Sequence, residues 1–191
     1  MNRGYHEIKE HGKREFPFNI YPCSIPVDFS HVALHWHEEM EIIAVKKGKG
    51  RITVDTVSYP VEEGDILAVF PGQLHAISCG NGERMEYENI IFRLSMLMGD
   101  NGDGCTVHFL KPLQEGQAKN PVLIQRNQPD HEVFGKVIQE LDRFSEIRGN
   151  GYQLAVKGQL FLFLYYAYGR GILFTEKKPG HAREKIKGIL E

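Results

Sequence analysis

The sequence has few cysteines, which limits the part that disulfide bonds can play in its fold. Its 191 residues include only Cys23, Cys79 and Cys105, and no two of them form a Cys-x-x-Cys pair. An odd number of cysteines without paired spacing is typical of reduced thiols and argues against a disulfide-stabilised secreted domain. We therefore expect the protein in the cytoplasm.

Long apolar segments and excess charge are missing too. The longest apolar run, residues 160–168, is too short to span a bilayer, and residues 1–16 lack the apolar stretch of a secretory signal. The net charge is −2, with acidic and basic residues interleaved. Such a chain has no basic surface for a phosphate backbone, so we expect no membrane contact and poor nucleic-acid binding by this chain alone.

A histidine-rich segment provides a group of candidate metal ligands. On an extended strand His35, His37 and Glu41 project to one face, because successive side chains alternate between faces. His75 follows a second apolar segment, which begins at Gly64. Imidazole and carboxylate groups together suit zinc, nickel, manganese or iron, so the four residues predict a divalent metal site or a polar ligand pocket.

These residues resemble the two cupin motifs. The first motif, His-x-His, three or four residues, Glu, six residues, Gly, is matched by His35, His37, Glu41 and Gly48. The second is matched by Gly64, Gly72 and His75. The departures are Phe70 in place of a proline, Cys79 in place of an asparagine, and Phe29 in place of a glycine.

A narrower resemblance extends over about residues 15–171. The segment HWHEEMEIIAVKKGKGRITVDTVSYPVEEGDILAVFPGQLHA is similar to the ligand-sensing half of AraC-type transcription regulators. This resemblance implies a mainly β fold, a cupin-like (jelly-roll) barrel followed by a C-terminal helical hairpin. It also implies that DNA is bound by a separate C-terminal helix-turn-helix domain, which we expect to be missing from this chain.

The pattern of apolar residues agrees with a β-barrel. Short apolar runs recur about every ten residues between turn signals, and we expect Gly48-Lys49-Gly50 to separate two of these strands. The predicted strands are 42–45, 51–54, 57–61, 66–70, 85–94, 107–110 and 122–124.

The period changes to that of helices after residue 128. Asp130 is expected to cap a helix that Gly149-Asn150-Gly151 ends. A second helix, 152–168, has two apolar faces: Leu154, Phe161, Leu164, Tyr165 and Tyr168 on one, and Val156, Leu160, Phe163 and Ala167 on the other. We predict a homodimer through residues 130–168; the alternative is a monomer that buries both faces.

These patterns divide the chain into four predicted parts. They are an N-terminal arm (1–20), a sensing barrel (21–127), a helical dimerisation hairpin (128–171), and a linker with the start of a DNA-binding domain (172–191). The AraC resemblance implies an arm that folds over the ligand pocket; a frayed terminus is the alternative.

Other polar residues are weaker candidates. Tyr87 and Arg93 share a strand face with Asn89 and are predicted to contact a ligand, unless that face lies outside the barrel. Trp36 is expected in the core or at a rim. We expect the remaining histidines at the surface, namely His6, His11, His31, His108, His131 and His181.

The leading hypothesis is a sensing and dimerisation domain of an AraC-like regulator without catalytic residues. A small molecule such as a sugar would bind beside His35, His37, Glu41 and His75 and control DNA binding by the further domain. The alternatives are a metal-dependent cupin enzyme, a dioxygenase or isomerase that uses the same four residues, and a sugar-binding module without signalling.

Overall fold

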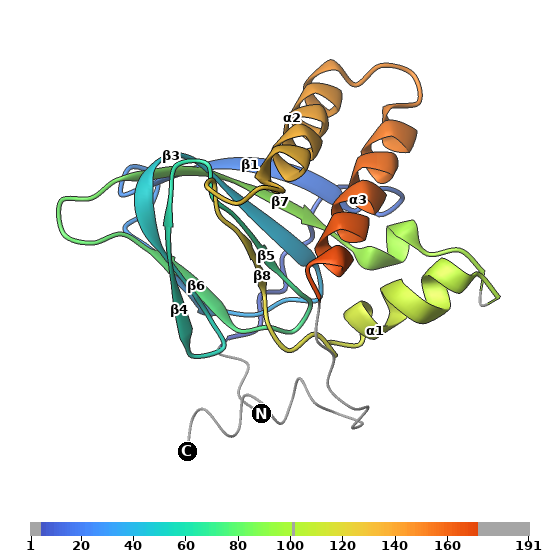
Figure 1. Cartoon of the computed structure of the whole chain (residues 1–191), viewed down its shortest axis with the longest axis horizontal. Coiled ribbons are helices and arrows are strands. Elements are labelled where there is room, and N and C mark those ends of the chain that lie inside the picture. The colour runs from blue at the N-terminus through green and yellow to red at the C-terminus, as the bar shows by residue number, and fades with distance from the viewer. Residues whose placement is uncertain (1–4, 101, 172–191) are drawn as a thin grey trace.

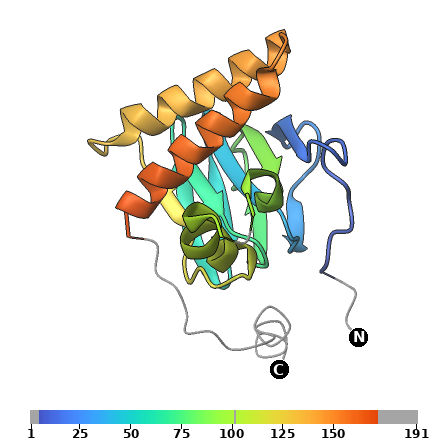
Figure 2. The ribbon, with the colours of Figure 1, turned by 90° about the vertical axis from the view of Figure 1, so that its right-hand side faces the viewer.

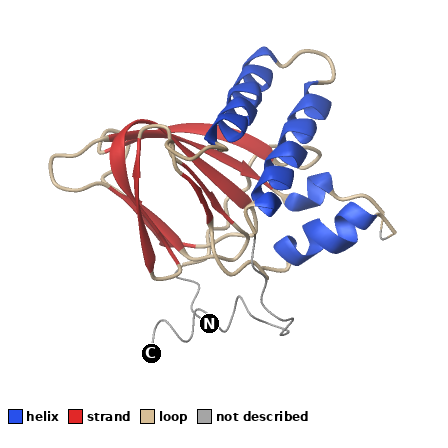
Figure 3. Ribbon diagram, viewed as in Figure 1, coloured by secondary structure: helices blue, strands red, loops and turns tan. Residues whose placement is uncertain are grey.

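The computed structural model describes residues 5–100 and 102–171. The strands are β1 Phe18–Ile25, β2 Val32–His35, β3 Met40–Val54, β4 Val57–Glu62, β5 Ile66–Val69, β6 His75–Ser78, β7 Met85–Phe92 and β8 Val122–Ile124. The helical elements are η1 Leu94–Leu97, η2 Thr106–Leu110, α1 Lys111–Gln114, α2 His131–Ile147 and α3 Tyr152–Gly169. Figure 3 shows the strands gathered in one body, with the helices beside it.

The strands form two sheets that share β3. Its first half lies in a sheet with the order β1-β7-β3-β5-β8, and its second half pairs with β4 and β6, which in turn pairs with β2. The expected break at Gly48-Lys49-Gly50 is wrong, because β3 runs on through it. The strand bends there instead: the register shifts between Val45 and Lys47, and Gly48 has φ +77°.

The shared strand has a core on each side. Glu41, Ile43 and Val45 face the barrel interior, whereas Met40 and Ile42 face the helices. Residues 40–45 are therefore all buried. All of them except Glu41 are apolar, so the segment lacks the alternation of polar and apolar residues that is typical of a strand with one exposed face.

The two long helices lie across the outer face of the first sheet (Figures 1 and 2). Phe134 of α2 packs edge-on against Phe163 of α3, and both are fully buried. The expected fold, a cupin-like β fold followed by two C-terminal helices, is confirmed. The division into four parts stays a prediction, and the expected linker with its further helix lies outside the described residues.

The segment predicted as a strand at 107–110 is helical. The Asp103 carboxylate accepts hydrogen bonds from the Thr106 backbone N–H (2.8 Å) and hydroxyl (2.7 Å), which satisfies donors at the start of this turn. Thr106, Leu110 and Leu113 are buried at helical spacing. A four-residue apolar run cannot distinguish a buried strand from a buried helix, and here the local capping decides for the helix.

The predicted cap of α2 is also wrong. Asp130 makes no side-chain bond to the first turn and instead accepts two bonds from Arg170 Nη1, at 2.8 and 2.6 Å. Arg170 Nη2 donates to the Leu123 carbonyl (3.0 Å). One guanidinium therefore joins the end of α3 to the start of α2 and to β8.

The two faces of α3 differ, with two exceptions to the predicted sets. Val156, Leu160, Phe163 and Ala167 are buried. Of the other set, Leu164 is buried with them and Tyr168 is partly buried against the core. Leu154, Phe161, Leu162 and Tyr165 are exposed. In the part of the chain that the structure describes, no helix is both long and apolar enough to cross a membrane.

Candidate functional site

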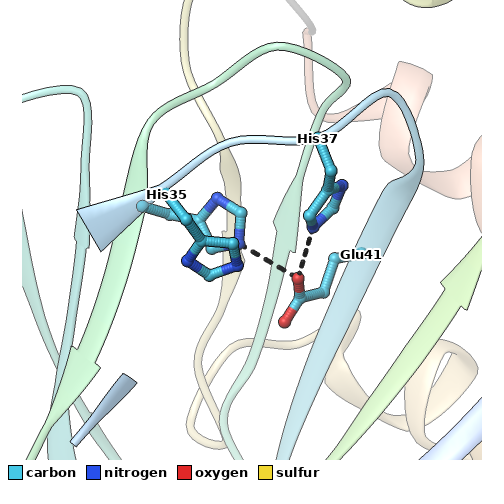
Figure 4. A group of neighbouring side chains, drawn as sticks. His35, His37 and Glu41 are labelled. Atoms are coloured by element: carbon cyan, nitrogen blue, oxygen red, sulfur yellow. Dashed lines mark hydrogen bonds and ion pairs between the residues drawn. The ribbon is translucent and has the colours of Figure 1, made fainter. Parts of the chain in front are cut away.

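Four polar side chains converge inside one end of the barrel (Figure 4). One potential ligand atom from each of His35, His37, Glu41 and His75 lies within 4.8 Å of the others. The three N-terminal members were expected on one strand, and this is wrong. β2 ends at His35, and the chain bends at residues 38–39 before β3 begins, so His37 belongs to the connection. Strand β2 pairs with β6 so that His35 lies opposite His75, and this pairing places His75, the fourth residue, beside the others.

A backbone carbonyl close in sequence orients each histidine ring. The Nδ1 atom donates to a carbonyl two residues away: Ala33 for His35 (2.9 Å), Glu39 for His37 (3.1 Å) and Gln73 for His75 (3.0 Å). A carbonyl oxygen can only accept, so Nδ1 carries a hydrogen in all three rings. The Nε2 atoms are left for a partner inside the site, as in histidines whose second ring atom binds a metal.

The carboxylate of Glu41 lies between two of these Nε2 atoms. Its Oε2 is 3.0 Å from His37 Nε2 and 3.1 Å from His75 Nε2, and the residue is only 2% exposed. A carboxylate oxygen and an unprotonated Nε2 are both acceptors and repel each other at this distance. The arrangement therefore requires positive charge at its centre, supplied by protons on Nε2 or by a metal ion.

The pKa shifts agree with this requirement. Burial by itself raises the pKa of Glu41, but the charge of His75 and the bonds from His37 and His75 outweigh it and hold the pKa far below its usual range. Burial likewise lowers the pKa of His37, but Glu41 outweighs it and raises that pKa. The pKa of His35 is lowered, chiefly by burial and also by the charge of His75.

The residues present fit a divalent metal. Ligands that neighbour each other on one ion, at bond lengths of about 2.1 Å, lie about 3 Å apart. The two contacts of Glu41 Oε2 have this separation. Three imidazoles and one carboxylate suit zinc, nickel, manganese or iron.

A buried amide holds the turn that presents His75. Gln73 is 2% exposed, and its Oε1 accepts a bond from the Phe70 N–H (2.9 Å). Asp55 accepts a bond from the Leu74 N–H (3.3 Å), which ties this turn to the end of β3. Sequence reasoning missed Gln73; its position two residues before the motif histidine was the available signal.

Tyr87 and Arg93 occupy different surroundings. Tyr87 is buried inside the barrel, and its hydroxyl has no hydrogen-bond partner among the described residues apart from the neighbouring Cys23 thiol. Burial raises its pKa strongly. Arg93 lies just beyond β7, is half exposed and donates to Glu39 Oε1 (2.8 Å), so it does not join the four converging residues.

The N-terminal segment contacts the cluster. The carboxylate of Glu7 lies 3.5 Å from His35 Nε2. His11, expected at the surface, is only 5% exposed, and its ring centroid lies 6.2 Å from that of His37. Residues 5–16 show no apolar periodicity, and so the sequence carried no signal for this contact.

The remaining aromatic and histidine predictions vary in outcome. Trp36 stacks on His6 at 4.1 Å and is partly buried, as expected of a rim aromatic. His31 and His108 are exposed, whereas His6 and His131 are partly buried; His181 lies outside the described residues. The His131 ring contacts the Gly64 carbonyl through Nε2 (2.7 Å), a structural role that joins α2 to the barrel.

Known proteins resemble this chain over its barrel and helices. The model of the family described as the AraC-like ligand binding domain matches residues 26–164. An uncharacterized HTH-type transcriptional regulator of Bacillus subtilis, YdeC, is 27% identical over 88 residues, which are 46% of this chain and 30% of that protein.

Solved structures with a similar barrel include a cupin 2 conserved barrel domain protein of Salinispora arenicola, with 22% identity and a TM-score of 0.38 over 42% of this chain and 66% of that one. A predicted oxalate decarboxylase of Thermotoga maritima has 25% identity and a TM-score of 0.36 over 39% of this chain and 64% of that one. The chain spans less than a third of the curated regulator and less than two thirds of either solved chain.

Proposed function

The chain belongs to the AraC-like ligand-binding domain family, and from this premise we propose that it senses a small molecule for a transcription regulator. The ligand, such as a sugar, binds at the barrel end that holds His35, His37, Glu41 and His75. Its binding controls DNA recognition by a helix-turn-helix domain of the kind named in the Bacillus subtilis relative. The proposed location is the cytoplasm.

One observation carries this proposal: a buried polar cluster occupies the end of an otherwise apolar barrel. Buried ionisable groups cost free energy that an apolar core would not require. Glu41, His37 and His75 are all less than 4% exposed and converge on one point. Functional sites are where such clusters are retained at the expense of stability.

A divalent metal is part of the proposal. His35, His37, Glu41 and His75 would hold it, and when bound it supplies positive charge that attracts oxygen atoms of a ligand. Tyr87 stays in the proposed ligand set because its buried hydroxyl is a donor with only a weak thiol neighbour. Arg93 acts on the proposed ligand site only indirectly. It pairs with Glu39, whose carboxylate lies 3.7 Å from His37 Nδ1.

Sensing requires that the ligand bind two arrangements of the protein with different affinity, because equal affinity shifts no equilibrium. Isothermal titration with a panel of divalent metals and sugars tests the binding step. We expect His75→Ala to weaken binding at least tenfold, because it removes a buried ligand. His31→Ala, at an exposed histidine, is the matched control. Equal binding by both variants would contradict the proposed site.

The proposal includes a homodimer formed through residues 130–168. Leu154, Phe161, Leu162 and Tyr165 are exposed at helical spacing on one face of α3. A row of four exposed apolar side chains on a regular helix is typical of an interface between subunits.

A metal-dependent cupin enzyme, a dioxygenase or isomerase, is the second candidate. It is favoured by the same cluster, because four protein ligands leave coordination positions open on an octahedral ion. We propose no catalytic residue outside these four. Turnover of a candidate substrate that follows added Fe(II) or Mn(II) and disappears in Glu41→Ala would favour the enzyme over the sensor.

A further inference from the structure

Backbone bonds fix the start of the N-terminal segment beside the histidine cluster. His6 forms a parallel bridge with Trp36, the residue between the two histidines of the first motif. The Trp36 N–H donates to the Tyr5 carbonyl (2.8 Å), and the Glu7 N–H donates to the Trp36 carbonyl (3.0 Å). The His6 ring stacks on the Trp36 ring, so these two side chains share a face. Glu7, the next residue, therefore projects to the opposite face, as the two motif histidines do.

The carboxylate of Glu7 meets the ring atom of His35 that is left for the site. Glu7 Oε2 lies 3.5 Å from His35 Nε2, while His35 Nδ1 donates to the Ala33 carbonyl. A neutral imidazole with its hydrogen on Nδ1 presents a lone pair at Nε2, and a carboxylate oxygen is also an acceptor. Two facing acceptors require positive charge between them, which is the requirement already found at Glu41.

The separation of these two atoms is that of two ligands on one ion. It is longer than an ordinary hydrogen bond between nitrogen and oxygen, which measures about 2.7 to 3.2 Å. With bonds of about 2.1 Å, neighbouring ligands lie about 3.0 Å apart at a right angle and about 3.4 Å apart at a tetrahedral angle. A shift of a few tenths of an ångström would therefore bring Glu7 to an ion that His35 binds.

Glu7 also lies within electrostatic range of two other histidines. Burial lowers the pKa of His37, but Glu41 outweighs it and Glu7 adds to the rise. Burial lowers the pKa of His11 despite the opposing charge of Glu7. The Nε2 atom of His11 is buried and has no hydrogen-bond partner among the described residues. An unpaired buried ring atom costs free energy, and so it indicates a further polar group on this side of the cluster.

The charge balance of the cluster favours a second carboxylate. With neutral imidazoles, Glu41 offsets only half the charge of a divalent ion, and a net charge in a buried site is costly. Glu39 is also buried, but Arg93 already balances it at 2.8 Å. Glu7 pairs with no lysine or arginine among the described residues, so its charge is available to the site.

We propose that Glu7 is a further ligand of the divalent metal, supplied by the N-terminal segment. This inference rests on the metal of the proposed function and extends its ligand set beyond the residues of the two motifs. Three imidazoles and two carboxylates leave the loaded site neutral. They exceed the four ligands of tetrahedral zinc but leave a position open on an octahedral ion, so the set favours manganese, iron or nickel. The open position would take an oxygen atom of the effector.

The test uses Co(II) as a probe of the full chain, with affinity measured against a competing chelator and coordination followed by visible absorption. We expect Glu7→Gln to weaken Co(II) binding at least tenfold. We also expect its absorption spectrum to differ from that of the wild type, because a water molecule replaces the carboxylate on the ion. The side chain of Glu7 is 33% exposed, so the variant should keep the fold.

Glu10→Gln is the matched control, since it removes the same charge at an exposed position of the same segment. It should keep the affinity and the spectrum of the wild type. Wild-type affinity and spectrum in Glu7→Gln would overturn the inference and leave the four-residue metal site standing. Equal weakening in both variants without a spectral change would reveal an effect of charge alone and would also refute Glu7 as a ligand. Absence of Co(II) binding by the wild type would sink this inference together with the proposed metal site.

Discussion

At the scale of single residues, the shared orientation of three histidines leads to a prediction about metal content. Because each Nδ1–H is held by a carbonyl, each Nε2 is available without rearrangement. We expect protein purified without chelators to carry about one equivalent of a divalent transition metal per chain, and His75→Ala less than about a tenth. Elemental analysis measures both, with His31→Ala as control. Less than about a tenth of an equivalent in the wild type would end the metal hypothesis.

A second prediction concerns the pH dependence of the metal-free protein. Glu41 raises the pKa of His37 against the effect of burial. Since the folded-state pKa lies above the unfolded value, this stabilisation is complete below about pH 6.5 and is lost as pH rises through the folded-state pKa. Each unit of the shift contributes about 1.4 kcal/mol at most.

The variant Glu41→Gln removes this stabilisation. We therefore expect the free energy of unfolding of the wild type to exceed that of the variant by more at about pH 6 than at about pH 9. Urea denaturation with a chelator present measures the difference, which avoids effects of metal loss. A difference that stays constant or grows with pH would contradict the proposed pairing.

At the scale of elements, the bend of β3 depends on a glycine. Gly48 has φ +77°, and a Cβ built on it would lie 2.0 Å from the Arg84 carbonyl oxygen. Gly82 has nearly the same φ, +76°, with open space around it. We expect Gly82→Ala to lower the free energy of unfolding by about 1 to 2 kcal/mol, the cost of a left-handed residue. Gly48→Ala should cost more than about 3 kcal/mol, because backbone must also move.

Urea denaturation measures the free energy of unfolding of both variants. Because the two glycines have nearly the same φ, the difference between the losses is the cost of the clash at Gly48 alone. Equal losses would show that the backbone at Arg84 can move away from residue 48 at little cost, and the close approach would then not explain the need for glycine at position 48.

The elements that the sequence predicted well are those in which one pattern dominates. The helical spacing of Phe134, Val137 and Leu141 and the glycines at 149 and 151 located α2 and its end correctly. Prediction failed where one local pattern is compatible with two structures. A glycine such as Gly48 can mark a turn, but here it allows a bend in a continuous strand. The pattern of residues 107–110 fits a strand or a helix, and the hydrogen bonds of Asp103 favour the helix.

The four residues of the cluster could be predicted one by one because their spacing in the sequence matches the two motifs. The residues that surround the cluster could not be predicted, because contacts between distant parts of the chain bring them there. His11 is buried only because the N-terminal segment runs beside β1, where its Nδ1 lies 3.1 Å from the Tyr21 hydroxyl. No sequence pattern within residues 5–16 encodes a contact with residues more than twenty positions away, such as His35 and His37.

At the scale of the whole molecule, the N-terminal segment connects the barrel cluster with the helical layer. Glu7 and His11 lie against the histidine cluster, and Phe16 contacts Tyr152 of α3 edge-on at 5.7 Å. The other long helix, α2, packs on α3. A ligand at the cluster therefore adjoins a segment that continues to the helices, and this gives the cluster a physical route to influence the helical layer.

The final prediction concerns assembly. Leu154 and Tyr165 are 77% and 70% exposed on one face of α3, with Phe161 and Leu162 between them. Burying this face against a second copy is favoured by the apolar area removed from water. We expect a dimer at micromolar concentration by light scattering, and a monomer for Tyr165→Glu, whose charge would be buried unpaired. Val57→Glu, at an exposed apolar residue of β4, should remain a dimer. A monomeric wild type would refute the dimer and leave the exposed face of α3 without this explanation.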